Sequence, residues 1–93
     1  MTRKGVENSE YDQYLLRLGA RIKEYRLARG WSQHYVCKTF DFYESHWRLL
    51  EQGKVISVPS LYKIAKVYEI DPSELLSGLY IVDSKEDAPA KEA

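Results

Sequence analysis

QHYVCKTFDFYESHWRLL, residues 33–50, carries the strongest structural pattern in the chain. Counted from its first residue, the fourth, eighth, tenth, fifteenth and eighteenth positions are all apolar: Val36, Phe40, Phe42, Trp47 and Leu50. Two short helices that cross at a tight turn must bury side chains at about these positions. The spacing therefore predicts one helix over residues 33–40 and a second over residues 43–52, with Gly53 as its end.

Two other positions strengthen this pattern. Cys37 is small, as the closest approach of two helices requires, and Asp41 marks the turn, where Asp is among the few residues besides Gly that tolerate a positive φ. Apolar residues at helical spacing often form only an ordinary amphipathic helix pair. The small residue and the tolerant turn favour a helix-turn-helix instead, and the register of Trp47 with Leu50 makes Trp47 a core residue.

A first helix is expected before this pair. Residues 1–8 are polar and are expected to be flexible, and Ser9 with Asp12 resembles a capping box at the start of a helix that reaches about Arg29. Gly30 can end this helix in the left-handed conformation, and Ser32 can cap the next one. The apolar face of this first helix consists of Tyr11, Leu15, Leu18, Ile22 and Tyr25.

Two more helices are expected after the pair. Pro59 suits the first position of a fourth helix. Its core-facing stripe consists of Leu61, Ile64, Ala65 and Tyr68. Asp71, Pro72 and Glu74 have the spacing of N-cap, first residue and capping-box partner for a fifth helix, which Gly78 can end. The sequence thus predicts an all-α domain of five helices over residues 9–78.

Composition narrows the class of protein. Ninety-three residues suffice for one domain, and the single Cys excludes an intrachain disulfide and a cysteine metal cluster. There is no apolar run of transmembrane length and no signal-peptide pattern, so a cytoplasmic protein without a membrane partner is expected. No catalytic set or phosphate-cradling glycine loop is present, and the two histidines are twelve residues apart with no nearby ligand pattern. We expect neither an active site nor a bound metal or cofactor.

Charge is unevenly distributed along the chain. The net charge is zero overall, but residues 17–70 contain ten Lys and Arg against five Asp and Glu, a net charge of +5. Residues 77–93 have a net charge of −2. Positive charge on the compact part is what binding to nucleic acid requires, although mixed-charge helical surfaces are also common in proteins that bind none.

Residues 18–76 resemble the Xre-type, phage-repressor-like (Cro-like) helix-turn-helix family. The resemblance rests on LGARIKEYRLARGWSQ, on the helix pair above, on LLEQGK and on VPSLYKIAKVYEIDPSELL. It implies a five-helix lambda-repressor-like fold and a transcription regulator, usually dimeric. Some members of this family bind proteins instead.

The resemblance also implies roles for individual positions. Gln33 would lie against the DNA backbone and could reach a base, and Tyr43, Glu44 and Ser45 would begin the recognition helix, where base edges are read. Gln52 and Lys54, with nearby backbone N–H groups, would contact phosphates. Arg26 and Glu51 match a buried ion pair with a structural role.

Several residues depart from the family pattern or need separate weighing. Tyr43 stands where a small hydroxyl residue often caps the recognition helix, which leaves Asp41 as the candidate cap. Leu49 is apolar where a polar residue is frequent, and Glu44 is acidic at the DNA-facing end. The segment between Gly53 and Pro59 is about two residues longer than the common pattern.

The remaining polar residues of the pair each allow two readings. Arg48 either contacts a guanine or phosphate or pairs with Glu44 one turn earlier. His34 can touch a phosphate at the start of its helix, whereas His46 is as readily a solvent-facing residue.

The leading hypothesis is a dimeric transcription regulator that binds a palindromic operator in double-stranded DNA, with residues 43–52 in the major groove. The alternative is an antitoxin or adaptor that uses the same fold to bind a protein. The apolar run at residues 79–82 could pair as a strand, pack into a dimer or cover the protein's own core, and dimerisation is preferred because two-fold symmetry doubles the binding surface. Residues 83–93 are expected to form a disordered acidic tail.

Overall fold

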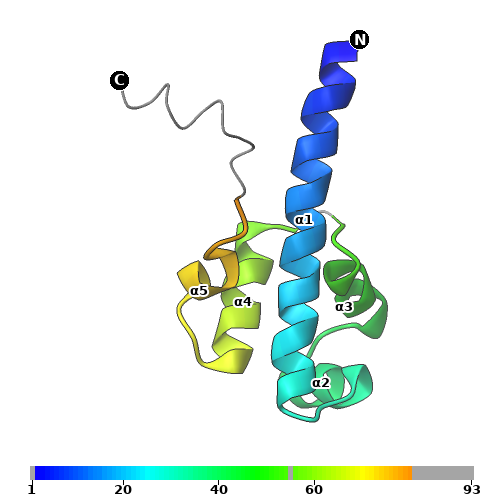
Figure 1. Cartoon of the computed structure of the whole chain (residues 1–93). Helices are drawn as coiled ribbons and strands as arrows, with labels where there is room; N and C mark the ends of the chain where they lie inside the picture. The colour runs from blue at the N-terminus through cyan, green and yellow to red at the C-terminus, as the bar shows by residue number, and fades with distance from the viewer. Residues whose placement is uncertain (1, 55, 81–93) are drawn as a thin grey trace.

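The computed structural model describes residues 2–54 and 56–80, with side chains from residue 10 onward; this part of the chain is helical and has no strand (Figure 1). The helices are α1 (Thr2–Ala28), α2 (Gln33–Phe40), α3 (Glu44–Glu51), α4 (Val58–Tyr68) and α5 (Pro72–Leu76). The prediction of five helices is confirmed. None of the described helices is both long enough and apolar enough to cross a membrane.

α1 lies between the α2–α3 pair and the α4–α5 pair, and its N-terminal part projects beyond the other helices (Figure 1). It begins at Thr2, so the prediction that the helix starts at a cap on Ser9 is wrong. Residues 2–8 contain no proline, and extending a helix costs much less than starting one. Tyr11 was expected on the buried face but is 54 % exposed, because the core begins one turn later, at Leu15.

The core takes one face from each helix. Its largest fully buried side chains are Ile22, Val36, Trp47, Leu50, Ile64, Tyr68 and Leu75. Phe40 and Phe42 pack at the edge of this cluster, so all five apolar positions that predicted the helix pair contribute to the core. The hydroxyl of Tyr68 donates a hydrogen bond to the carbonyl oxygen of Ile22 at 2.9 Å, which satisfies the polar end of this buried ring.

Two glycines bring α1 and the end of α3 into direct backbone contact. A Cβ atom at Gly19 would lie 2.6 Å from the carbonyl oxygen of Glu51, and one at Gly53 would lie 2.7 Å from the Cα of Leu16. Gly53 also has a φ of 80°, which favours glycine. No side chain fits at either position without moving one of the two helices.

The turn between α2 and α3 forms as predicted in its main features. The hydroxyl of Ser32 caps α2 by accepting a hydrogen bond from the N–H of Tyr35 at 2.9 Å. Asp41 ends α2 with a φ of 64°. The expectation that Asp41 caps α3 is therefore wrong. Tyr43 is the N-cap residue of α3, and its side chain makes no capping hydrogen bond. Cys37 is buried between the helices, and this burial raises the pKa of its thiol.

α4 and α5 begin at side-chain caps. The hydroxyl of Ser57 accepts a hydrogen bond from the N–H of Ser60 at 3.2 Å, so Pro59 is the second residue of α4 and not the first. Asp71 caps α5 as predicted, by accepting a hydrogen bond from the N–H of Ser73 at 2.8 Å, and this bond lowers the pKa of Asp71.

The described chain ends just beyond α5. Leu79 is 3 % exposed and belongs to the core, whereas Tyr80 is 74 % exposed. The Nε of Arg17, on α1, donates a hydrogen bond to the carbonyl oxygen of Leu79 at 2.8 Å and fixes this segment. Residues 79–82 were expected to pair as a strand, pack into a dimer or cover the protein's own core. Leu79 covers the core. Residues 81–82 and the expected tail at 83–93 lie outside the described residues.

Candidate nucleic-acid interface

α3 separates its side chains into a buried face and an exposed face. Trp47 and Leu50 are buried, and the side chain of Glu51 is only 5 % exposed. The exposed residues at and along α3 are Tyr43, Glu44, Ser45, His46, Arg48, Leu49 and Gln52. The residues expected to read bases therefore all lie on the surface, because the helical period places them opposite Trp47 and Leu50.

A buried ion pair fixes the orientation of α3. Arg26 on α1 donates two hydrogen bonds to the carboxylate of Glu51, from Nε to Oε2 at 2.6 Å and from Nη2 to Oε1 at 3.0 Å. Its Nη1 donates a third to the carbonyl oxygen of Trp31 at 2.9 Å. This two-point contact is the geometry that an Arg forms best with a carboxylate, and it is the pair that the resemblance implied.

Two other side chains share the same carboxylate. Trp47 Nε1 donates to Glu51 Oε2 at 2.6 Å, and Gln33 Nε2 donates to Oε1 at 2.9 Å. Burial opposes ionisation of Glu51, but the hydrogen bonds from Arg26, Gln33 and Trp47 outweigh it and lower its pKa. The hydrogen bond to Glu51 likewise raises the pKa of Arg26. One carboxylate thus joins α1, α2 and α3.

This arrangement gives Gln33 a structural contact that the sequence did not predict. One of its two side-chain N–H groups donates to Glu51 within the protein, whereas the resemblance placed the residue against the DNA backbone. The residue lies at the start of α2 and links that helix to α3. The second N–H of the same amide group remains able to donate to a phosphate, so the expected backbone contact stays a prediction.

On the exposed face, Glu44 lies between His34 and Arg48. Its Oε2 is 2.6 Å from His34 Nδ1 on α2, and its Oε1 is 3.9 Å from Arg48 Nη1 one turn along α3. The surface pair of Glu44 with Arg48 was one of the two readings from sequence. The shorter contact with His34 was not foreseen, because it crosses the turn between two helices.

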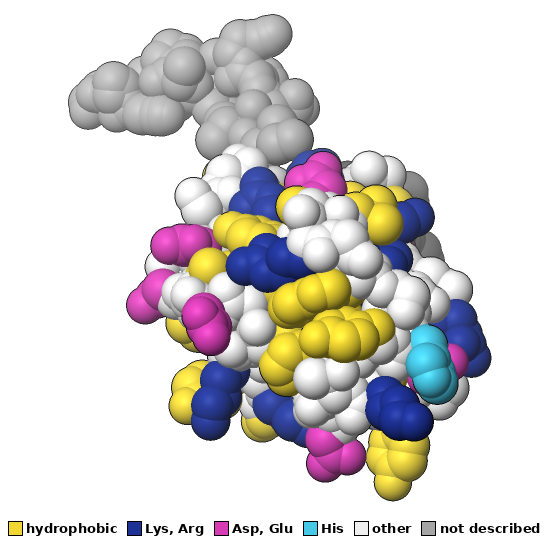
Figure 2. Space-filling view, turned by 90° about the horizontal axis from the view of Figure 1, so that it is seen from below, with side chains coloured by type: hydrophobic (Ala, Val, Ile, Leu, Met, Phe, Trp, Pro, Cys, Tyr) yellow, Lys and Arg dark blue, Asp and Glu magenta, His cyan; other side chains and the backbone are white. Residues whose placement is uncertain are grey.

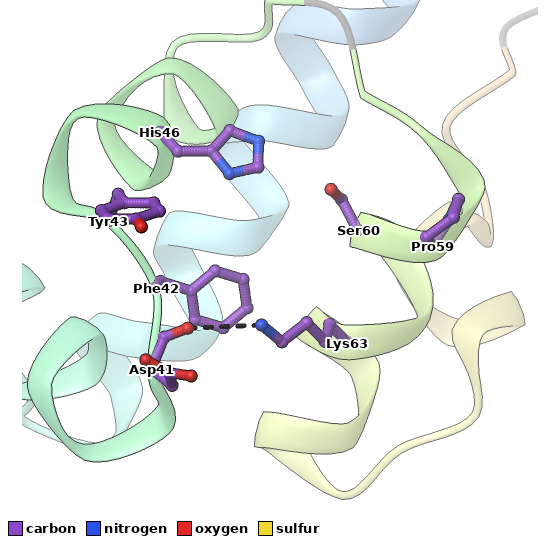
Figure 3. Close-up of a pocket in the computed structure, with 7 residues that line it drawn as sticks. All are labelled: Asp41, Phe42, Tyr43, His46, Pro59, Ser60 and Lys63. Carbon is purple, nitrogen blue, oxygen red and sulfur yellow. Dashed lines mark hydrogen bonds between the residues drawn. The ribbon is translucent and has the colours of Figure 1, made fainter.

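A cleft of about 410 Å³ separates the start of α3 from the start of α4 (Figure 3). Its lining residues are Asp41, Phe42, Tyr43, His46, Pro59, Ser60 and Lys63. Lys63 Nζ donates to the carbonyl oxygen of Asp41 at 3.3 Å and lies 4.5 Å from the centre of the Phe42 ring. The imidazole of His46 points into the same cleft from α3 (Figure 3).

The sequence did not predict that this surface includes His46, Ser60 and Lys63. The available signal was the helical period of α4, in which Lys63 falls next to the buried stripe and on the side of the α2–α3 turn. Together these residues place a cation, a hydroxyl and an imidazole beside the exposed end of α3. This is a set of groups that can contact an anion.

The end of α3 differs from the expectation. The side chains of Gln52 and Lys54 are exposed, as phosphate contacts would require. Their backbone N–H groups, however, donate to the carbonyl oxygens of Arg48 and Leu49 at 3.0 Å, and that of Gly53 donates to Leu50 at 3.2 Å. These three N–H groups therefore close the end of α3, and the phosphate contacts expected near Gln52 and Lys54 stay a prediction for their side chains.

No protein-family model, curated protein or solved structure matches this chain. The geometry above is thus the basis for any functional assignment. Within the described residues, no group of three or more His, Cys, Asp or Glu side chains is placed to hold a metal ion.

Proposed function

We propose that the protein is a sequence-specific DNA-binding transcription regulator that inserts α3 into the major groove. The single observation that supports this function best is the division of α3 into a buried face, fixed through Glu51, and an exposed face. A recognition helix must present several side chains to base edges from a rigid support. In this proposal, Tyr43, Ser45 and Arg48 choose bases from that face.

The surroundings of α3 supply the contacts that would set its pose on the duplex. Lys54 lies beyond one end of the helix, and Lys63, with Ser60 and His46, lies beside the other. Cations on both sides of a helix in the groove can reach the two phosphate backbones. The proposal includes the lambda-repressor-like, Xre-type arrangement of the helices and a homodimer on a palindromic operator, with recognition helices one duplex turn, about 34 Å, apart.

The test is selection of bound duplexes from a random pool, followed by titration of the enriched duplex with salt. We expect an enriched inverted repeat and a steep loss of affinity with rising salt, because binding releases counterions from the phosphates. The substitution Arg48→Ala should change the enriched sequence. Lys54→Ala should weaken all duplexes similarly. A pool without enrichment, or binding that salt does not affect, contradicts the proposal.

An antitoxin or adaptor function is supported by a different observation. Tyr43 is 83 % exposed and Leu49 46 % exposed on the α3 face, and Tyr35 on α2 is exposed as well. Hydrophobic side chains also gather on the face seen from below, among Lys and Arg side chains (Figure 2). Exposed aromatic and aliphatic residues of this kind are common in protein interfaces.

Co-purification from the native cell separates the two functions. A protein partner bound in a fixed ratio, whose presence protects Leu49 and Tyr43 from solvent, would support the adaptor function. The substitution Leu49→Ser should then weaken that complex by tenfold or more, while it leaves duplex binding within a few-fold of the original. The opposite pattern would support the DNA-binding function.

A further inference from the structure

We infer that Glu44 positions Arg48, with His34 as its counter-ion, and that DNA binding is coupled to uptake of a proton at His34. The inference rests on the proposed function, because it concerns how the same α3 face chooses a base. In this account Glu44 does not read a base itself. It is a positioning residue that acts through Arg48.

Each carboxylate oxygen of Glu44 faces a different side chain, one a histidine and the other an arginine. Oε2 lies 2.6 Å from His34 Nδ1, a hydrogen-bond distance, whereas Oε1 lies 3.9 Å from Arg48 Nη1, which is beyond one. His34 comes from α2 and Arg48 from α3, so the three side chains connect the two helices across their turn. The side chains of His34, Glu44 and Arg48 are 70 %, 44 % and 51 % exposed, so DNA can reach all three.

A nearby duplex acts on these three side chains in opposite directions. Phosphates and guanine edges attract Arg48 and repel the carboxylate of Glu44. Because the contact of Glu44 with Arg48 is the longer of the two, DNA should draw Arg48 away while Glu44 stays with His34. Glu44 is thereby turned toward α2, and Arg48 starts with its Nη1 3.9 Å from the Glu44 carboxylate.

Once Arg48 contacts DNA, His34 is the remaining partner of Glu44. A carboxylate and nearby phosphates both favour imidazolium over neutral imidazole, and histidine is the side chain that changes charge between pH 5 and 8. The complex should therefore hold more protons than the free protein. By linkage, affinity for DNA should rise as the pH falls from 8 to 6.

The charged groups around each histidine make the two a matched pair for experiment. Glu44 of α3 contacts His34 and has Arg48 near its other oxygen, and Lys38 follows His34 one turn later on α2. His46 instead lies in the cleft of Figure 3, where Asp41 and Lys63 are the charged residues. The substitution His46→Gln is thus a comparison for His34→Gln, because it removes the other imidazole and leaves the contact of His34 with Glu44 in place.

The experiment measures binding of the enriched duplex and of a scrambled duplex from pH 6 to 8 at constant ionic strength. For the original protein, affinity for the enriched duplex should fall by up to about tenfold per subunit for each unit by which the pH rises. His34→Gln should abolish this dependence and reduce the discrimination between the duplexes several-fold. His34→Lys, which carries a permanent cation, should keep the discrimination and lose the pH dependence. His46→Gln removes an imidazole that the proposed function places near phosphate, so it should weaken both duplexes similarly and keep the discrimination between them.

Glu44→Gln distinguishes positioning from simple repulsion. If Glu44 positions Arg48, the variant should bind the scrambled duplex more tightly and lose preference at the base pair that Arg48 contacts. If Glu44 only repels DNA, both duplexes should gain affinity equally, and the inference is overturned. Unchanged pH dependence in His34→Gln overturns it too. In either case an enriched, salt-sensitive duplex would still support the proposed function, whereas its absence in the original protein would reject both.

Discussion

Glu51 is the single residue that fixes the orientation of α3 and of its exposed face. Its carboxylate accepts hydrogen bonds from Arg26, Gln33 and Trp47, which come from three helices. A buried ion pair of this kind adds little net stability compared with apolar residues of the same volume. Its main effect is to specify one arrangement of the groups around it.

Glu51→Gln should destabilise the fold by about 3–5 kcal/mol, because it leaves the guanidinium of Arg26 buried without a counter-charge. Urea unfolding followed by circular dichroism measures this loss. The double variant Arg26→Met with Glu51→Met serves as the control and should recover most of it, since no charge is then buried. A double variant as unstable as Glu51→Gln would contradict this explanation.

The same carboxylate predicts a pH dependence of stability. Hydrogen bonds lower the pKa of Glu51 in the folded protein from its ordinary value of 4.5, so ionised Glu51 stabilises the fold above that value. The contribution is lost as the pH falls through the lowered pKa. The difference in unfolding free energy between the original protein and Glu51→Gln should thus be constant near pH 7 and narrow below about pH 4.5. The exposed variant Glu44→Gln should show a much smaller change.

Residue contacts were the least predictable part of this molecule. The pair of Arg26 and Glu51 could be expected from the family resemblance. The links from Gln33 to Glu51 and from His34 to Glu44 join residues eighteen and ten positions apart, on different helices. Helical spacing predicts which face a residue occupies, but it does not predict the partner that a side chain meets across a turn.

Among the elements, the turn between α2 and α3 was predicted correctly because it depends on local conformation. Asp41 has a φ of 64°, a conformation that costs most residues about 1–2 kcal/mol. Asp41→Gly should therefore leave the unfolding free energy within about 1 kcal/mol of the original. Asp41→Val should lower it by about 1–2 kcal/mol, measured by urea unfolding. Equal stability of the two variants would show that the turn does not require this conformation.

Gly19 provides a test of the contact between α1 and α3. Gly19→Ala places a Cβ atom 2.6 Å from the carbonyl oxygen of Glu51, so the helices must separate, at a cost of about 1–3 kcal/mol. Gly30→Ala is the matched control, because a Cβ there meets nothing within 4 Å and only the φ of 71° is strained. Gly19→Ala should also weaken duplex binding by shifting α3, whereas Gly30→Ala should lower stability without that effect.

Helix boundaries were predictable where a cap or a glycine marks them and less so elsewhere. Asp71 and Ser32 were identified because their side chains precede clear apolar patterns. Ser57 was missed because Pro59 offered a competing start signal two residues later. The start of α1 was placed at Ser9 for a similar reason, since a hydroxyl residue within a longer helix looks the same in sequence as a cap.

For the whole molecule, charge is the property that sequence describes most directly. Residues 83–93 contain four acidic and two basic residues, so removing them raises the net charge from zero to +2. The shortened chain should bind scrambled duplexes more tightly at low salt, because less negative charge opposes the phosphates. Screening should remove most of this difference above about 0.15 M salt. A difference that persists at high salt would indicate that the tail acts by contact and not by charge.

The way in which the helices pack against one another could not be predicted from the sequence. Periodicity and the start and stop signals predicted five helices, and a contiguous core follows from their apolar faces. The close backbone contact of Gly19 with the end of α3 and the cleft between α3 and α4 depend on how these faces fit together. Neither is encoded in the spacing of any one helix.

The buried Cys37 has a practical consequence. As the chain's single cysteine, 4 % exposed and with a thiol pKa raised by burial, it reacts slowly while the domain is closed. The rate at which a thiol reagent labels it therefore reports how often α2 and its neighbours open, and the unmodified protein contains its own probe for this motion. A ligand that holds α2, α3 and α1 together should slow the labelling, so the same thiol offers a screen for binding partners that requires no engineered tag.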